Sequence, residues 1–282
     1  MKINLLPVCA IILATTALTS CEDIYEGGEK DLPEVAVQLK AQITPYEKDK
    51  PEAFEGNSKV GVYMLASEDG APIVSNLELP MDDEGVIDTG NSLFYPKDGS
   101  KVNIFCYTPY TASASAANTL RLDVATPAAA AASDYLYSAN RNRYMALAPV
   151  KVQLKHILSR AEFGITAGEG ISDADLAAIS FAISDMPVKA DFDLFSGEIT
   201  HGQTGDIAMT VLNGGRNAEC SVIACNVPNL VVSCTLKGVS FTKKLGPIDF
   251  MQGSVYKFDV VVSEPGFEIV LRQIEDWKVE EY

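Results

Sequence analysis

Residues 35–43 have the sequence Val35-Ala36-Val37-Gln38-Leu39-Lys40-Ala41-Gln42-Ile43, in which every odd-numbered residue is apolar. Successive side chains of a β-strand point to opposite faces of a sheet, so a period of two indicates a strand with one buried face. This stretch therefore predicts that the folded part of the chain begins with a half-buried strand.

Similar short stretches recur along the chain and are separated by turn residues such as Pro96-Lys97-Asp98-Gly99-Ser100. The further predicted strands are 59–65, 102–107, 150–154, 161–165, 179–183, 191–195, 208–212, 221–225, 230–236, 239–245, 255–262 and 267–274. We expect strands 221–225 and 230–236 to form a hairpin around a turn at 226–229. Helical periodicity is nearly absent, apart from one short helix predicted behind a Ser172 cap and a patch of helix propensity at 128–132.

The number and spacing of these strands predict an all-β fold. Short strands at intervals of roughly ten residues, each followed by turn signals, are typical of β-sandwiches. The chain has 282 residues, which is long for one sandwich. We therefore expect two tandem sandwiches, an N-terminal one at 33–155 and a C-terminal one at 156–282, with the boundary near residue 155.

The N-terminus has the three parts of a secretory leader. Lys2 is basic, residues 5–18 are mostly apolar, and Leu18-Thr19-Ser20-Cys21 follows. The segment is short and interrupted for a transmembrane span. The last four residues resemble a bacterial lipobox, which predicts a lipoprotein signal peptide at 1–20, cleavage between Ser20 and Cys21, and lipidation of the Cys21 thiol. The alternative is a plain secretory leader with an incidental cysteine.

The residues after this cysteine predict a tether. Residues 21–32 are acidic and contain glycine, a composition that does not bury a core. Two or three acyl chains on Cys21, such as palmitate, would hold the protein at the outer membrane, since one chain alone binds marginally. The acidic patch resembles the surface-export signal of Bacteroidetes lipoproteins, which predicts a surface-exposed protein; the alternative is a solvated linker that faces the periplasm.

Composition argues against several functional classes. The net charge of −16 argues against a nucleic-acid partner, which would need basic patches. The chain contains no G-x-S-x-G, H-E-x-x-H, P-loop or dinucleotide motif, so we expect no enzyme, and we predict no cofactor and no metal site. Four cysteines of the mature chain lie in apolar stretches, and for each we expect a buried free thiol. The alternative is a Cys225–Cys234 bridge across a hairpin. These cysteines are Cys106, Cys220, Cys225 and Cys234.

Several segments together resemble the fimbrillin family of Bacteroidales lipoproteins, the Mfa-like subunits of type V pili. The segment 154–160 matches an L-x-H-x-L-S-R pattern, 252–258 matches G-x-x-Y-x-F, and 274–277 matches I-x-x-W. Residues 93–96 with 102–110 match a strand that ends in aromatic-Pro-Tyr. Together with the lipobox, the match spans nearly the whole chain.

The resemblance implies two transthyretin-like sandwich domains and a structural role in a cell-surface fimbria that supports adhesion. In that family a protease removes the first strand of a lipoprotein precursor, and a strand from the next subunit fills the groove. The strand predicted at 35–43 is the candidate for removal, and the C-terminal end at 267–282 is the candidate donor. The implied partners are other fimbrial subunits, the outer membrane, and a host or bacterial surface ligand.

The chain departs from the family at the expected cleavage site. Polymerising members are cut by an Arg-specific protease, but the first arginine after the leader is Arg121. The candidate processing residues are the lysines near the expected cut, Lys40, Lys48, Lys50 and Lys59. Without a cut the subunit would keep its lipid and act as an anchor, so shaft, anchor and tip roles stay open. The alternative function is a non-polymerising surface lipoprotein that binds glycan or a host protein.

Overall fold

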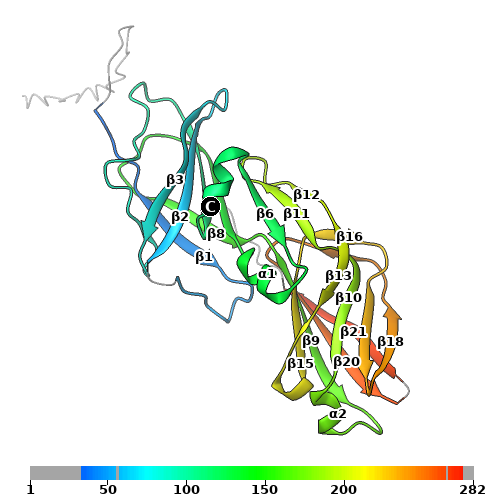
Figure 1. Ribbon diagram of the computed structural model, residues 1–282. Coiled ribbons are helices and arrows are strands. Elements are labelled where there is room, and N and C mark those ends of the chain that lie inside the picture. The colour runs from blue at the N-terminus through cyan, green and yellow to red at the C-terminus, as the bar shows by residue number, and fades with distance from the viewer. Residues whose placement is uncertain (1–32, 55–56, 265, 276–282) are drawn as a thin grey trace, which may run out of the picture. The chain divides into compact units, whose positions relative to one another are not determined.

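The computed structural model describes residues 33–54, 57–264 and 266–275 of the chain (Figure 1). Strands dominate this part, and the α-helices in it, α1 and α2, have six and five residues. The all-β prediction is confirmed. No helix of the described residues is long and apolar enough to cross a membrane.

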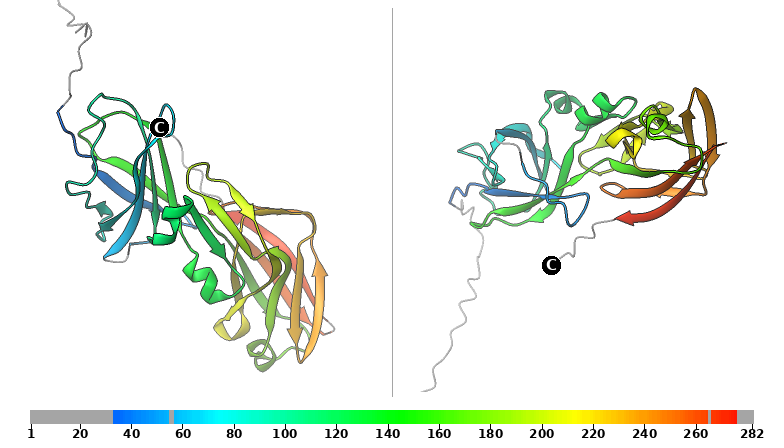
Figure 2. Two further views of the ribbon diagram at one scale, coloured as in Figure 1. Left: turned by 45° about the horizontal axis from the view of Figure 1, so that its top comes forward. Right: turned by 90° about the horizontal axis from the view of Figure 1, so that it is seen from below.

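The first sheet is a ladder of seven strands that closes on itself. Its order is β1-β4-β3-β2-β5-β7-β8, and it closes because β1 pairs with both β4 and β8 (Figure 2). The strands are β1 (Leu39–Thr44), β2 (Ser58–Ala66), β3 (Pro72–Met81), β4 (Val86–Ile87), β5 (Val102–Thr108), β7 (Leu136–Arg143) and β8 (Val150–His156). The described strand β1 is shifted towards the C-terminus of the predicted 35–43, because Ala36 and Val37 contact residues 93–94, outside the ladder.

Two further sheets pack around a shared apolar core. One has the order β14-β15-β9-β20-β21 and the other β13-β10-β17-β18. Their strands are β9 (Ser159–Ala167), β10 (Ser180–Pro187), β13 (Thr204–Ala208), β14 (Thr210–Leu212), β15 (Asn217–Val222), β17 (Val231–Leu236), β18 (Val239–Lys244), β20 (Val255–Ser263) and β21 (Gly266–Glu275). Phe163 of β9 meets Phe181 of β10 edge to face at 5.7 Å, an arrangement that aromatic pairs favour.

Two small sheets complete the described chain. In one, β6 (Thr119–Asp123) pairs with β11 (Lys189–Asp193), which pairs with β12 (Ile199–His201). This sheet therefore joins strands from both sides of residue 155; the domain boundary near that residue stays a prediction. In the other, β16 (Cys225–Val227) pairs with β19 (Ile248–Phe250). The helices are α1 (Pro127–Ala132), α2 (Asp173–Ala177) and the 3-10 helices η1 (Ala112–Ala116) and η2 (Asn213–Gly215).

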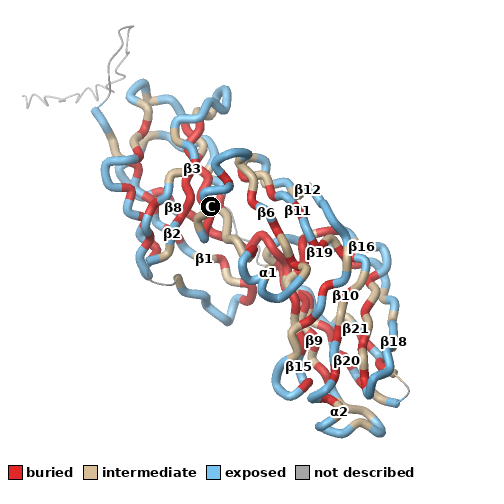
Figure 3. The backbone as a smooth tube through the Cα atoms, viewed as in Figure 1, coloured by how far each residue is buried: buried red, intermediate tan, exposed pale blue. Residues whose placement is uncertain are grey.

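Buried residues form two clusters, one inside the seven-stranded ladder and a larger one that includes the later sheets. Figure 3 shows that burial follows the strands, whereas the turns are exposed. Strand β2 is buried on both faces, because Val62 points into the first cluster and Tyr63 into the second. Phe195 covers this second face and contacts Tyr63 at 5.3 Å and Phe105 at 5.2 Å.

Two local predictions are confirmed and one is wrong. Ser172 begins α2 with a capping box to Asp175, and the four described cysteines are free and buried. The hairpin predicted around 226–229 does not form. Residues 225–227 pair with β19, whereas 231–236 pair with β10 and β18, so this turn connects two different sheets.

Candidate functional site

The N-terminal strand β1 lies where the first ladder closes. It runs parallel to β8 from Leu39 opposite Val150 to Thr44 opposite Lys155, and β1 and β8 lie side by side in Figure 2. On its other edge it pairs antiparallel with the two residues of β4. A strand between two others satisfies the backbone groups of both. Loss of β1 would therefore expose the facing edges of β8 and β4.

Side chains also bind β1 to the interior of the ladder. Val37, Leu39 and Ala41 are at most 3% exposed, and they belong to the same cluster as Val152 and Leu154 of β8. Burial of a valine or leucine side chain contributes about 1.5–3 kcal/mol. An empty β1 position would consequently be a groove with an apolar floor between two strand edges.

The residues before β1 follow a separate path of backbone contacts. Ala36 forms an isolated antiparallel bridge with Phe94. The Val37 amide donates to the Leu93 carbonyl at 2.9 Å, and the Thr89 hydroxyl donates to the Val37 carbonyl at 2.8 Å. These contacts hold the chain as it enters the ladder.

The turn between β3 and β4 touches β1 at Gly85. The Ala41 amide donates to the Gly85 carbonyl at 2.7 Å. Gly85 has a φ of +79°, and a Cβ atom there would lie 2.3 Å from the Ala41 carbonyl oxygen. Glycine is thus favoured both by the left-handed backbone and by the close approach of β1.

We expect Gly85→Ala to destabilise the protein more than Gly70→Ala. Gly70 has a similar φ of +73° but no atom within 4 Å of its Cβ position, so its substitution adds backbone strain alone, about 1–2 kcal/mol. Gly85→Ala adds a clash with β1 that costs about 1–3 kcal/mol more. Chemical denaturation measures the free energy of unfolding of both variants, and equal losses would contradict close packing of β1 on this turn.

The four candidate processing lysines are all exposed but differ in backbone surroundings. Lys40 is inside β1 and is paired on both sides. Lys59 is in β2 and is paired with β3. Lys48 and Lys50 lie in the β1–β2 connection, residues 45–57, and Lys50 directly precedes Pro51. The structure thus brings two of the four together in one connection.

Three predicted features fall wholly or partly outside the described residues. The cleavage between Ser20 and Cys21 and the lipidation of Cys21 lie outside them, as do residues 276–282 of the predicted donor. The described part of that donor forms β21, which pairs with β20 and lies at the edge of its sheet. Its end therefore remains bound within its own chain up to Glu275.

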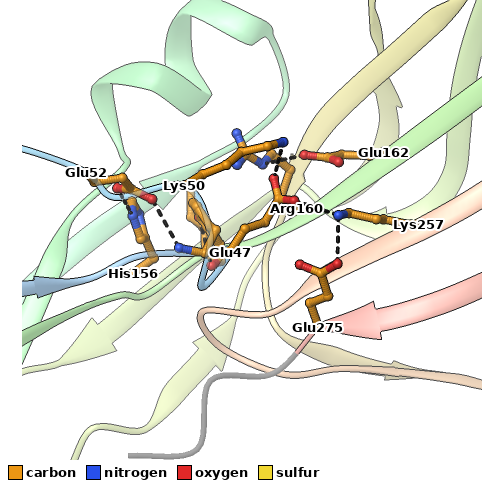
Figure 4. A network of polar contacts seen from close by, with 10 residues as sticks. Glu47, Lys50, Glu52, His156, Arg160, Glu162, Lys257 and Glu275 are labelled. Atoms are coloured by element: carbon orange, nitrogen blue, oxygen red, sulfur yellow. Dashed lines mark hydrogen bonds and ion pairs between the residues drawn. The ribbon is translucent and has the colours of Figure 1, made fainter.

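A network of partly buried polar contacts fixes the β1–β2 connection (Figure 4). Glu52 accepts a hydrogen bond from the Tyr46 amide at 3.0 Å, and its other oxygen lies 2.8 Å from His156 Nε2. His156 Nδ1 lies 2.9 Å from Asp134. Glu47 lies 2.6 Å from Lys257, which also contacts Glu275, so the connection is linked to the end of β8 and to β20.

The charges of this network favour a protonated histidine. Burial by itself lowers the pKa of His156, but its hydrogen bonds with Asp134 and Glu52 outweigh burial and raise that pKa. Burial likewise would raise the pKa of Glu52, yet its bonds with His156 and the Tyr46 amide lower it. An imidazolium between two carboxylates is therefore the favoured state.

Sequence analysis does not single out Tyr46, Glu47 or Glu52, because nothing near them in the chain indicates their partners. The available signal is the segment 154–160, quoted above for its family resemblance. His156 and Arg160 of this segment contact the Tyr46 ring, and its Leu158 carbonyl accepts the hydrogen bond of the Tyr46 hydroxyl. His156 and Arg160 stand in an otherwise apolar connection between two strands, and this feature of the sequence indicates that their side chains have partners.

Comparison with solved structures shows the same fold in other proteins. A crystal structure of a protein from Bacteroides uniformis, described as a cell adhesion protein, aligns with a TM-score of 0.69 and 22% identity over 87% of this chain and 99% of that one. The tip fimbrial protein Mfa3 from Porphyromonas gingivalis aligns with a TM-score of 0.58 and 11% identity over 87% of this chain and all of that one. At these identities the likeness concerns the fold alone.

Sequence comparisons identify the family. A curated relative from Bacteroides uniformis, named as the fimbrium subunit Fim1C, is 23% identical over 96% of this chain and 94% of its own length. A family model described as fimbrillin-like matches residues 47–277. Since that match covers most of the sequence, the chain belongs to the fimbrillin-like family.

Proposed function

We propose that the chain is a structural subunit of a cell-surface fimbria, delivered to the outer membrane as a lipoprotein through Cys21 and joined to other subunits by replacement of β1. Membership of the fimbrillin-like family and likeness to a relative named as a fimbrium subunit support the fimbrial role. In this proposal the two halves of the chain are tandem transthyretin-like sandwiches.

The observation that carries this proposal is the position of β1. It is the first strand of the described chain, it closes the ladder between β8 and β4, and its Leu39 and Ala41 side chains are buried. Removal of such a strand leaves unpaired backbone groups that a strand from another chain can satisfy. Because the donated segment and the groove that receives it come from different parts of the chain, repetition of the contact would build a filament.

The connection after β1 contains the bond that we propose is cut, Lys48–Asp49. A strand that is paired on both sides does not enter a protease site, which argues against Lys40, and Lys59 is likewise within a ladder. The bond after Lys50 precedes Pro51, whose ring removes the N–H and restricts the residue before it. Lys48 is exposed in a turn of the connection.

We place the donated strand beyond Glu275. Residues 266–275 already pair with β20, so their donation would break a ladder of the donor's own sheet. In the sequence after Glu275, apolar Trp277 and Val279 alternate with charged residues, the same period of two as in β1. If no cut occurs, β1 stays in place and the lipid on Cys21 makes the subunit an anchor.

Limited cleavage with a Lys-specific protease tests this function. We expect the cut wild-type protein, when concentrated, to form a ladder of oligomers on gels, because an open groove accepts a strand from the next chain. Lys48→Gln should block both the cut and the ladder, whereas Lys59→Gln, a matched change outside the connection, should block neither. A wild-type chain that is cut at Lys48 and stays monomeric at high concentration would contradict strand exchange.

A further inference from the structure

Tyr46, two residues after β1, occupies a polar site rather than an apolar one. Its ring stacks on the His156 ring with centroids 3.8 Å apart and planes 20° apart. The guanidinium carbon of Arg160 lies 4.7 Å from the same ring, within range of a cation–π contact. The hydroxyl donates to the Leu158 carbonyl at 3.0 Å, and the residue is 6% exposed.

The next residue, Glu47, is buried against a cation. It is 7% exposed, and its carboxylate oxygens lie 2.6 Å from Lys257 Nζ and 2.6 Å from Lys50 Nζ. Burial would raise the pKa of Glu47, but the hydrogen bonds from both lysines outweigh it and lower the pKa. Both Tyr46 and the negatively charged Glu47 therefore have bound partners just after the end of β1.

The groups that hold this pair are organised without it. His156 has Asp134 and Glu52 as partners, both of which remain after a cut at Lys48–Asp49. Arg160 has Glu162 at 3.2 Å, and Lys257 has Glu275 at 2.7 Å. His156, Arg160 and Lys257 thus each have a carboxylate partner other than Glu47 (Figure 4). We therefore expect these three side chains to stay charged and oriented when Tyr46 and Glu47 leave.

The site also has an opening. A cavity of about 230 Å³ is lined by Tyr46 and Arg160 together with Asp134, Thr210 and Cys220. The cavity therefore borders the Tyr46 ring on the side of Arg160. Tyr46 and Glu47 both lie on the N-terminal side of Lys48, so they belong to the same fragment as β1 after the cut.

We propose that His156, the Leu158 carbonyl, Arg160 and Lys257 form a binding site for an aromatic residue followed by an acidic one. In the uncut chain Tyr46–Glu47 fills this site. After the backbone is cut at Lys48–Asp49, the same pair keeps β1 bound. A replacing strand from another subunit has to displace this pair together with β1. The part of the proposal that concerns the replacing strand rests on the proposed exchange function; retention does not.

The first experiment measures retention in the cut full-length chain. The protein is cut at Lys48, diluted to nanomolar concentration, where chains do not meet, and the fraction of bound N-terminal fragment is followed by size exclusion and mass spectrometry. We expect Glu47→Gln and Tyr46→Ala to release the fragment about tenfold faster or more than wild type. Glu34→Gln, an exposed position of the same fragment that loses the same charge, is the control. Equal release rates for Glu47→Gln, Tyr46→Ala and Glu34→Gln would overturn the site.

The second experiment leaves the protein unchanged, so that folding of a variant cannot decide the result. Labelled peptides with the sequence of residues 35–48 are offered to the cut wild-type chain, one natural and one with Tyr46→Ala and Glu47→Gln. We expect the natural peptide to be incorporated about tenfold more. Equal incorporation, with a normal oligomer ladder, overturns the site and leaves the exchange function intact. Selective incorporation without any ladder supports the site and contradicts the exchange function.

Discussion

Leu39→Asp is expected to lower the free energy of unfolding by about 3–5 kcal/mol, because it removes a buried side chain and places an unpaired carboxylate in the interior of the ladder. Leu39 is 2% exposed in β1, and its cluster is apolar. Such a loss is a large share of the about 5–15 kcal/mol that stabilises a typical protein. Chemical denaturation gives the change directly.

The control for this variant is Gln38→Asp, which adds the same charge one residue earlier. Gln38 is exposed, so its substitution should change the free energy of unfolding by no more than about 0.5 kcal/mol. A comparable loss in both variants would show that added charge, rather than the buried face of β1, determines the effect. This outcome would also argue against an apolar floor in the groove that a replacing strand would fill.

His156→Gln is expected to lower the free energy of unfolding by about 2–4 kcal/mol. The substitution removes the cation between Asp134 and Glu52 and leaves two partly buried carboxylates without their shared partner. It also removes the ring on which Tyr46 stacks. The control is His201→Gln, since His201 is exposed and forms one hydrogen bond through its ring, to the Ala224 carbonyl.

The pH dependence of stability distinguishes this network from simple packing. The pKa of His156 is raised in the fold above its usual 6.5, so its contribution is complete below that value and is lost as the pH rises through the raised pKa. The pKa of Glu52 is lowered below 4.5, so its contribution is present above that value and is lost as the pH falls through the lowered pKa. Denaturation as a function of pH should show the alkaline loss in wild type and His201→Gln but not in His156→Gln.

Much of the fold could be predicted from local patterns, because half-buried strands reveal themselves by alternation. Strands such as β8 and β20 lie within a few residues of their predicted positions. Strand β3 was missed because its alternation is interrupted at Asn76, which has a positive φ of 44°. Alternation does not reveal strand β7, because its second half, residues 140–143, is entirely polar.

The pairing of strands could not be predicted, because it depends on contacts far apart in the sequence. The turn at 226–229 has good hairpin residues, yet β16 leaves for β19 and β17 pairs with β10. The polar site around Tyr46 could not be predicted for the same reason. Its partners lie about 110 and 210 residues further along the chain, as in Tyr46–Leu158 and Glu47–Lys257. The alternation of apolar residues predicts strand β1, but only the strand pairing in the structure shows that β1 closes the ladder.

Two separate sets of contacts hold strand β1 in place. The ladder and the apolar face hold Leu39–Thr44, and the polar site holds the two residues that follow Pro45. A cut at Lys48 would separate this unit from the rest without breaking either set of contacts. Premature loss of β1 would then be prevented until a competing strand is present, which keeps an aggregation-prone edge covered.

Amide hydrogen exchange of residues 150–155 tests the replacement of β1 most directly. The Val150 amide donates to the Gln38 carbonyl at 2.8 Å, and the residues after it pair with β1. In oligomers formed from chains cut at Lys48, we predict that these amides are protected while mass spectrometry finds the N-terminal fragment absent. Oligomers that retain the fragment in equal amount, or whose β8 amides exchange as fast as in chains stripped of it, would contradict the account.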